Sequence, residues 1–82
     1  MKYNIIYKKK ALKFIQKQPR NQQERIINAI EQLPQGDIVP VEGTDKYRLR
    51  IGSYRIIYHI DNNKLIITVV NAGSRGQIYN QY

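Results

Sequence analysis

The chain contains no cysteine among its 82 residues. This absence excludes both a disulfide framework and a zinc site built on thiolates. With one histidine and six scattered acidic residues, the sequence offers no cluster of metal ligands, and we expect neither a metal nor a cofactor. No run approaches the roughly 18–20 apolar residues of a transmembrane helix, and the first ten residues lack the cleavage site of a signal peptide. These absences predict a cytoplasmic protein.

Acidic residues are also scarce relative to basic ones. Six Asp and Glu stand against 14 Lys and Arg, which gives a formal net charge of +8 at pH 7. A field of that strength on a small domain favours polyanionic partners, namely nucleic acid, an acidic protein segment or an anionic membrane. The alternative is that the charge serves only solubility.

The N-terminal half predicts one strand and two helices. Segment 2–7 is rich in Ile and Tyr, which indicates a strand. In segment 8–18 apolar residues recur at helical spacing and lysines occupy the other faces, so we expect a short basic helix that ends before Pro19. A second helix is expected from about residues 19–22 to Leu33, because its apolar residues form one stripe. Together they indicate a helical hairpin.

The C-terminal half predicts strands. Segment 35–45, "QGDIVPVEGTD", has no sustained period and is expected to be a loop. Three strands are expected after it, joined by "GS" and "DNN" turns, at residues 46–51, 54–60 and 64–72. The first strand must find partners in the same sheet as these three. We therefore expect all of the elements to form one α+β domain over residues 1–82. Its two layers are the helical hairpin and a largely antiparallel sheet.

The stretch "YRLRIGSYRIIY" places three arginines inside a predicted pair of strands. If Gly52 and Ser53 form the hairpin loop, Arg50 lies directly opposite Arg55, and directly paired residues project to the same face. Side chains alternate along a strand, so Arg48 joins them on this arginine face, while the apolar residues face the helices. A direct pair of like charges is unfavourable in a sheet. We therefore favour an anion site over a merely solvated surface, with phosphate as the anion because guanidinium groups bind it through forked hydrogen bonds.

Several other features carry less specificity. His59 lies on the arginine face, but about 13 Å along the strand from Arg55, and we interpret it as a surface histidine. The segment "GSRG" fits an anion-binding nest of backbone amides or, more commonly, a simple turn. Core packing is expected for the tyrosines on the helix side of the hairpin, whereas Tyr79 can reach the arginine face and stack on an unpaired base. The helix-side tyrosines are Tyr47, Tyr54 and Tyr58.

The stretches "YRLRIGSYRIIYHI" and "LIITVVNAGSRGQIY", with the helix "ALKFIQKQP", resemble the RelE/ParE superfamily of bacterial toxins from type II toxin–antitoxin systems. The resemblance covers nearly the whole chain. It implies one of two activities. RelE-like members cleave messenger RNA in the decoding (A) site of the ribosome, whereas ParE-like members inhibit DNA gyrase and lack the nuclease residues.

The residues favour the RelE-like branch, a metal-independent endoribonuclease or mRNA interferase. By resemblance, the catalytic positions correspond to Arg50, Arg55, Arg75 and Tyr79. RNA binding is expected of Arg48, Lys46 and Ser74. Ser74 stands where many relatives have histidine, so a histidine base is not available there, and arginines replace lysines of some relatives although arginine does not readily release a proton.

The implied reaction is attack of the substrate's 2′-hydroxyl on the adjacent phosphate. Two alternatives stay open, a gyrase inhibitor without nuclease activity and a catalytically decayed module that only binds an antitoxin. The implied partners are a cognate antitoxin protein, mRNA in the ribosomal A site and ribosomal RNA, with no membrane.

Overall fold

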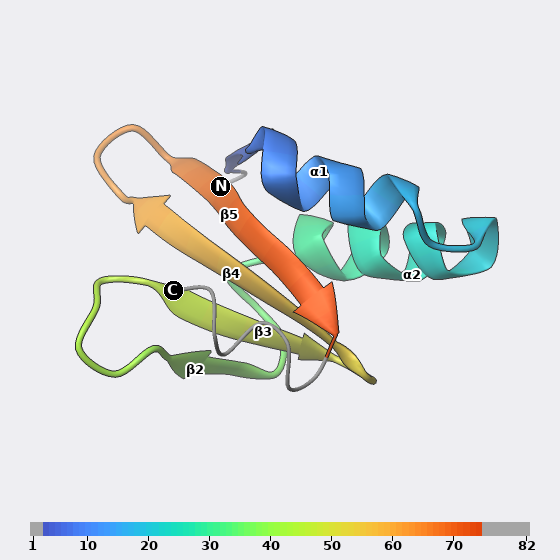
Figure 1. Cartoon of the computed structure of the whole chain (residues 1–82). Helices are drawn as coiled ribbons and strands as arrows, with labels where there is room; N and C mark the ends of the chain where they lie inside the picture. Colours follow the sequence, from blue (N-terminus) through green and yellow to red (C-terminus); the bar gives the residue numbers. More distant parts are fainter. Residues whose placement is uncertain (1–2, 75–82) are drawn as a thin grey trace.

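The computed structural model of the chain describes residues 3–74. They form an α+β fold in which two helices pack on one face of a sheet, as predicted, and the sheet has five strands rather than the expected four (Figure 1). No helix within these residues is long and apolar enough to cross a membrane. The elements in chain order are β1 (Asn4–Tyr7), α1 (Lys9–Gln16), α2 (Arg20–Glu31), β2 (Ile38–Pro40), β3 (Tyr47–Ile51), β4 (Tyr54–Asp61) and β5 (Ile66–Ser74).

The two helices follow from their apolar stripes. Helix α1 buries Ala11 and Ile15, and helix α2 buries Ile26 and Ile30. Complete burial of an isoleucine side chain contributes about 1.5–3 kcal/mol. Each helix ends two residues before its predicted end. Pro19 separates the two helices, and its fixed φ suits a residue that precedes the first helical turn.

The strands join in the order β1-β5-β4-β3-β2. Strand β1 runs parallel to β5, and the other neighbours are antiparallel. The first strand therefore joins the sheet of the C-terminal strands, as expected. The parallel pairing stops at Tyr7 opposite Val69, so the C-terminal part of β5 extends beyond the end of β1.

The expectation of a loop throughout residues 35–45 is wrong, because Ile38–Pro40 form strand β2. This strand pairs antiparallel with β3 and occupies the edge of the sheet. Pro40 cannot donate a backbone hydrogen bond, and an edge strand is where a sheet tolerates that loss. Three residues are too short to show a period of two, so only the partner strand reveals β2.

The main core lies between the sheet and the helices. It includes Leu49, Ile56 and Tyr58 from the central hairpin, none more than 2% exposed. Tyr47 stacks on Tyr58 with ring centroids 5.6 Å apart, but it is 36% exposed and lies outside the main core, so the expectation of core packing is wrong for Tyr47. A register shift between β4 and β5 leaves Val70 without a direct partner.

A smaller apolar cluster forms apart from the main core. It consists of Val41 and Ile57, both buried, with Val70 packed against them. Ile57 alternates along β4 with the helix-facing Ile56 and Tyr58, so this cluster lies on the sheet face opposite the helices. The arginine face is therefore a basic surface around an apolar patch.

Candidate nucleic-acid interface

The hairpin that carries the arginines has the predicted register. Gly52 turns the chain with a φ of +56°, in the left-handed region that glycine adopts without steric cost. Arg50 pairs directly with Arg55, and Arg48 with Ile57. Because the alternate residues of both strands pack in the helix-side core, the three arginines project from the opposite face.

Arg55 is a buried member of the site, only 5% exposed. Its Nη1 donates to the carbonyl oxygens of Gly52, at 2.7 Å, and Tyr54, at 2.8 Å. These bonds hold the guanidinium against the turn of its own hairpin. Arg55 thus supports the turn as well as adding charge to the face, a structural role that the strand pattern did not indicate.

Arg50 is exposed and paired with an acid. Its Nε and Nη2 each lie 2.6 Å from Oδ2 of Asp37, and its backbone N–H donates to the Asp37 carbonyl at 2.9 Å. The two side chains are 60% and 51% exposed. Sequence reasoning missed Asp37, because it lies in an irregular segment 13 residues before Arg50 and nothing in the local pattern links the two.

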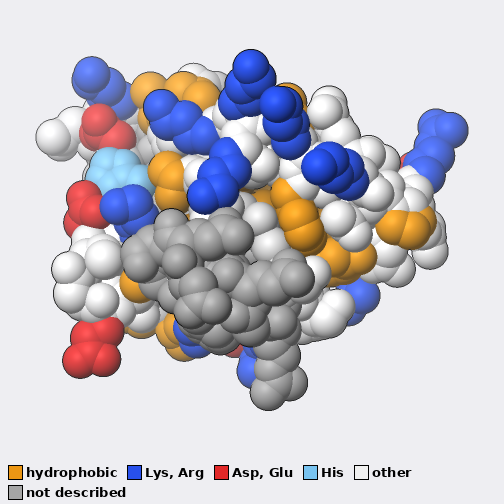
Figure 2. All heavy atoms as spheres, viewed as in Figure 1, with side chains coloured by type: hydrophobic (Ala, Val, Ile, Leu, Met, Phe, Trp, Pro, Cys, Tyr) orange, Lys and Arg blue, Asp and Glu red, His pale blue; other side chains and the backbone are white. Residues whose placement is uncertain are grey.

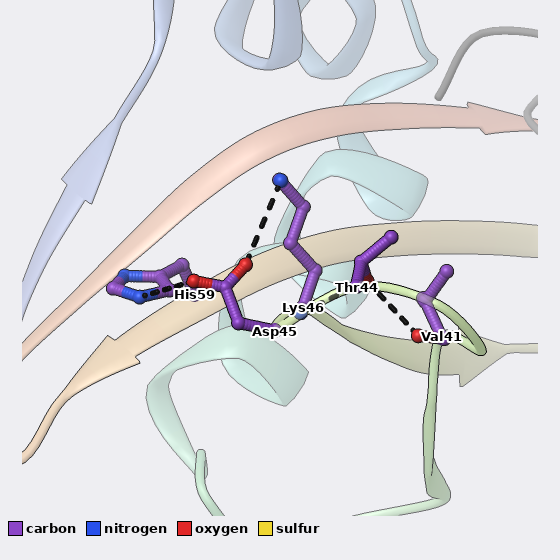
Figure 3. A network of polar contacts seen from close by, with 5 residues as sticks. All are labelled: Val41, Thr44, Asp45, Lys46 and His59. Atoms are coloured by element: carbon purple, nitrogen blue, oxygen red, sulfur yellow. Dashed lines mark hydrogen bonds and ion pairs between the residues drawn. The ribbon is translucent and has the colours of Figure 1, made fainter.

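A polar network lies at the start of β3. Asp45 sits between Lys46 and His59, with Oδ1 3.8 Å from the lysine Nζ and Oδ2 3.3 Å from the histidine Nε2 (Figure 3). The side chain of His59 is 40% exposed. Lys46 and His59, both at the far end of the hairpin from Gly52, are thus joined through one carboxylate. Asp45 was not among the residues singled out from the sequence.

The remaining predicted site residues are placed differently. Arg48, the second residue of β3, is half-buried. Ser74 is the last residue of β5 and pairs with Tyr54. Tyr54 faces the helix layer, where its hydroxyl donates to Gln18, so direct pairing places Ser74 toward that layer and away from the arginine face. Arg75 and Tyr79 lie outside the described residues.

Within residues 3–74, clear pKa shifts fall on two tyrosines of the sheet that face the helices. Burial, with a smaller contribution from Tyr47, raises the pKa of Tyr58 to about 12. Burial and the charge of Glu31 raise the pKa of Tyr7. No group of three or more His, Cys, Asp or Glu side chains that could hold a metal ion occurs in this part of the chain. What the arginine face offers is fixed positive charge, which binds and stabilises phosphate.

Comparisons with known proteins bear on the family and the fold. Over residues 5–79 the chain matches the family described as the ParE toxin of the type II toxin–antitoxin system parDE. Among solved structures, it is similar to a chain of the archaeal RelE–RelB complex from Pyrococcus horikoshii, with 29% identity, a TM-score of 0.77 and coverage of 94% of this chain and 99% of that one.

Two further structures share the fold. The intact RelBE toxin–antitoxin complex of E. coli matches with 20% identity, a TM-score of 0.74, and coverage of 92% and 99% of the two chains. The RelB–RelE complex of Methanococcus jannaschii matches with 23% identity, a TM-score of 0.72, and coverage of 94% and 98%. The comparison with curated proteins gave no match. Because the family match spans most of the chain, the protein belongs to the RelE/ParE superfamily of toxins from type II toxin–antitoxin systems.

Proposed function

We propose that the protein is a RelE-like toxin that cleaves mRNA in the A site of the ribosome, in the cytoplasm. The observation that carries this proposal is the direct pairing of Arg50 with Arg55 on the sheet face opposite the helices. Arg48 projects from the same face and Lys46 immediately precedes the same strand, so four basic residues lie along one hairpin. Such a surface suits the phosphate backbone of RNA.

The proposed reaction transfers a phosphoryl group within the RNA. The 2′-oxygen of one nucleotide forms a bond to the adjacent phosphorus, and the bond from phosphorus to the 5′-oxygen breaks. A base takes the 2′-hydroxyl proton, and the leaving 5′-oxygen gains a proton. The products are a 2′,3′-cyclic phosphate and a free 5′-hydroxyl. Negative charge gathers on the phosphoryl oxygens in the transition state.

The described arginines suit different parts of this task. Arg55 is held in place by two carbonyl oxygens, so its charge needs no reorganisation when the transition state forms. Arg50 is exposed and bonded to Asp37, and a phosphate would replace that carboxylate. Arg75 is proposed to complete the clamp, and Tyr79 to stack on a base or move a proton.

Backbone contacts and alignment complete the proposal. Arg48 and Lys46 are proposed to hold the RNA on the arginine face, and Ser74 to contact it from the helix side, at the end of β5. Neither arginine nor an ordinary tyrosine, with a pKa near 10, is a good base at neutral pH. We therefore expect slow cleavage of free RNA. Alignment of the mRNA by the ribosome can supply much of the rate, since positioning contributes roughly 7–11 kcal/mol in favourable cases.

An antitoxin partner belongs to the same proposal. The similar structures from Pyrococcus horikoshii, E. coli and Methanococcus jannaschii are complexes of RelE with RelB. We propose that this chain likewise binds a cognate antitoxin. A net charge of +8 favours an acidic segment in that partner.

The direct test maps RNA 5′ ends after the purified protein is mixed with ribosomes programmed with mRNA. We expect cuts in the A site that carry a 5′-hydroxyl, and at least about 100-fold slower cutting by Arg55→Lys and Arg75→Ala. Arg20→Ala, at the start of α2 and away from the hairpin, is the matched control and should cut normally. Full activity of both site variants would overturn the assignment of the catalytic residues.

Gyrase inhibition is the second candidate, because the matching family model is that of the ParE toxin. Induced expression in cells separates the possibilities. Translation arrest with cut transcripts supports the nuclease. A DNA-damage response with intact transcripts supports gyrase inhibition, and normal growth supports a decayed module that only binds an antitoxin.

A further inference from the structure

The N-terminal end of helix α1 carries more positive charge than its own stability favours, whereas Lys13 and Lys17 lie near the C-terminal end, where the helix dipole favours positive charge. The first turn of α1 has no acidic residue, and its N-cap residue Lys8 makes no side-chain capping hydrogen bond. Lysines at this end oppose the helix dipole, which favours negative charge at an N-terminus. Segment 8–18 contains no acid at all, and no ion pair joins an α1 lysine to another described residue. Lysines that work against the stability of the helix indicate a function other than folding.

Three of these lysines line one groove. The groove has a volume of about 290 Å³. Its walls are Lys10, Lys13 and Phe14 of α1, the C-cap residue Lys17, and Asn71, Ala72 and Gly73 of β5. It forms because β1 pairs with β5 only as far as Val69, which leaves α1 beside the last part of β5. Figure 2 shows basic side chains gathered over the α1 side of the molecule.

The groove adjoins the arginine face. Gly73 is one of its lining residues, and the same glycine pairs directly with Arg55 across β4 and β5. The lysine groove and the strand position of Arg55 thus share one neighbour, Gly73 of β5. A polyanion bound on the arginine face would therefore have the lysine groove beside it.

We propose that this lysine groove binds the phosphodiester backbone of the RNA segment that flanks the nucleotides on the arginine face. Lys10, Lys13 and Lys17 share one helix face, and they span about 10 Å along the axis, the stacked length of about three nucleotides. Lysine ammonium groups bind phosphate as point charges. The inference rests on the proposed RNA-cleaving function, for which it supplies a second contact with the substrate.

An acidic peptide is the competing occupant, and the groove suits it less well. A folded peptide partner normally buries a row of apolar anchors. Among the described residues, the apolar walls are Phe14 and Ala72 alone. The Phe14 ring packs edge-on against Tyr54 of the sheet, with centroids 6.0 Å apart. Positive charge dominates the rest of the lining.

The test compares two triple variants of the full chain with the same net charge. The groove variant is Lys10→Gln, Lys13→Gln, Lys17→Gln. The control is Lys8→Gln, Lys9→Gln, Lys64→Gln, three exposed lysines that do not line the groove. Binding of a short single-stranded RNA with methylated 2′-hydroxyls, which cannot react by 2′-attack, is measured by fluorescence anisotropy at several salt concentrations.

We expect the groove variant to bind at least about tenfold more weakly at low salt. The slope of log K against log salt should fall in magnitude by about 2, as three lost contacts to single-stranded RNA imply. The control should change the slope by less than 1. Equal losses in both variants would overturn the inference, because general charge would then account for the binding. So would a groove variant that loses affinity for polyglutamate but keeps its affinity for RNA.

Cleavage on ribosomes, measured in parallel, separates this inference from the proposed function. If the unmodified protein cuts mRNA on ribosomes but the groove variant binds RNA as the control does, only the groove inference fails. If the unmodified protein cuts no RNA, the proposed function fails, and the binding result then decides whether the groove holds RNA for another purpose.

Discussion

Arg50 and Arg55 stand directly opposite each other on β3 and β4, yet each guanidinium is bonded to a different part of the chain. Arg50 pairs with the Asp37 carboxylate, and Arg55 donates to the carbonyl oxygens of Gly52 and Tyr54. These separate partners explain how the sheet tolerates a like-charge pair without a ligand. For the same reason, substitutions that affect Arg50 and substitutions of Arg55 are expected to have different effects.

Removal of the Arg55 side chain is expected to affect stability as well as activity. Arg55→Ala leaves two carbonyl oxygens at the turn without their donor, so the free energy of unfolding should fall by about 1–3 kcal/mol. Arg55→Lys keeps one charged donor and should lose less. Urea unfolding, monitored by circular dichroism, measures both. An alanine variant as stable as the unmodified chain would show that the two hydrogen bonds do not support the turn.

Asp37→Asn is expected to release Arg50 at little cost to the fold. Both side chains are more than half exposed, and ion pairs in such positions contribute about 0–1 kcal/mol. Stability should therefore stay within about 1 kcal/mol, while RNA affinity at low salt rises a few-fold because the guanidinium no longer has a competing carboxylate. Glu24→Gln, on the exposed side of α2, removes the same charge elsewhere. If both variants gain equally in affinity, net charge rather than Arg50 explains the gain.

The hairpin was predictable because two independent rules agree on it. A glycine suited to positive φ lies between two segments of alternating polarity, and a shift of one residue would turn every apolar side chain outward. The ion pair of Arg50 with Asp37 was not predictable in this way. It joins residues far apart in sequence through a three-residue edge strand that has no period of its own. Asp45 was missed for a related reason, since it lies in the irregular residues just before β3 and meets His59 only across the paired strands β3 and β4.

Tyr58 is expected to make stability depend on pH in the alkaline range. Its pKa is raised to about 12 in the folded chain, chiefly by burial, from an ordinary value of 10.0. The unfolded chain therefore releases this proton first. The stabilisation is complete below pH 10, declines as pH rises from 10 to 12, and is lost above 12. A difference of about two units corresponds to about 3 kcal/mol.

Tyr58→Phe removes this titrating group. The lysines are the same in both proteins, so a difference between the two pH profiles of stability comes from Tyr58. Urea unfolding at several pH values between 8 and 12 should show a steeper loss of stability for the unmodified chain than for the variant. Absorbance near 295 nm follows the tyrosinate directly. Parallel curves for the two proteins would mean that Tyr58 ionises alike in the folded and unfolded states.

Gly52→Ala is expected to destabilise the hairpin through backbone strain rather than through a clash. The φ of +56° costs a residue with a Cβ about 1–2 kcal/mol. A Cβ at this position would lie 2.9 Å from Nη2 of Arg25, the far end of an exposed side chain that can move aside. Gly52→Asn should cost less than Gly52→Ala, because asparagine tolerates the left-handed region better. Ser53→Ala changes the neighbouring turn residue and should be nearly neutral.

The same three variants test whether the turn sets the arginine face. If alanine at residue 52 shifts the register, every side chain of one strand changes face, and Arg50 no longer meets Arg55. RNA binding should then fall by more than the loss of folded protein accounts for, while Ser53→Ala binds normally. Chemical shifts of the β3 and β4 amides report the register directly. A Gly52→Ala protein that keeps both its stability and its amide shifts would mean that glycine is not needed here, and that the pairing of the arginines is fixed by the packing of Leu49 and Ile56 beneath them.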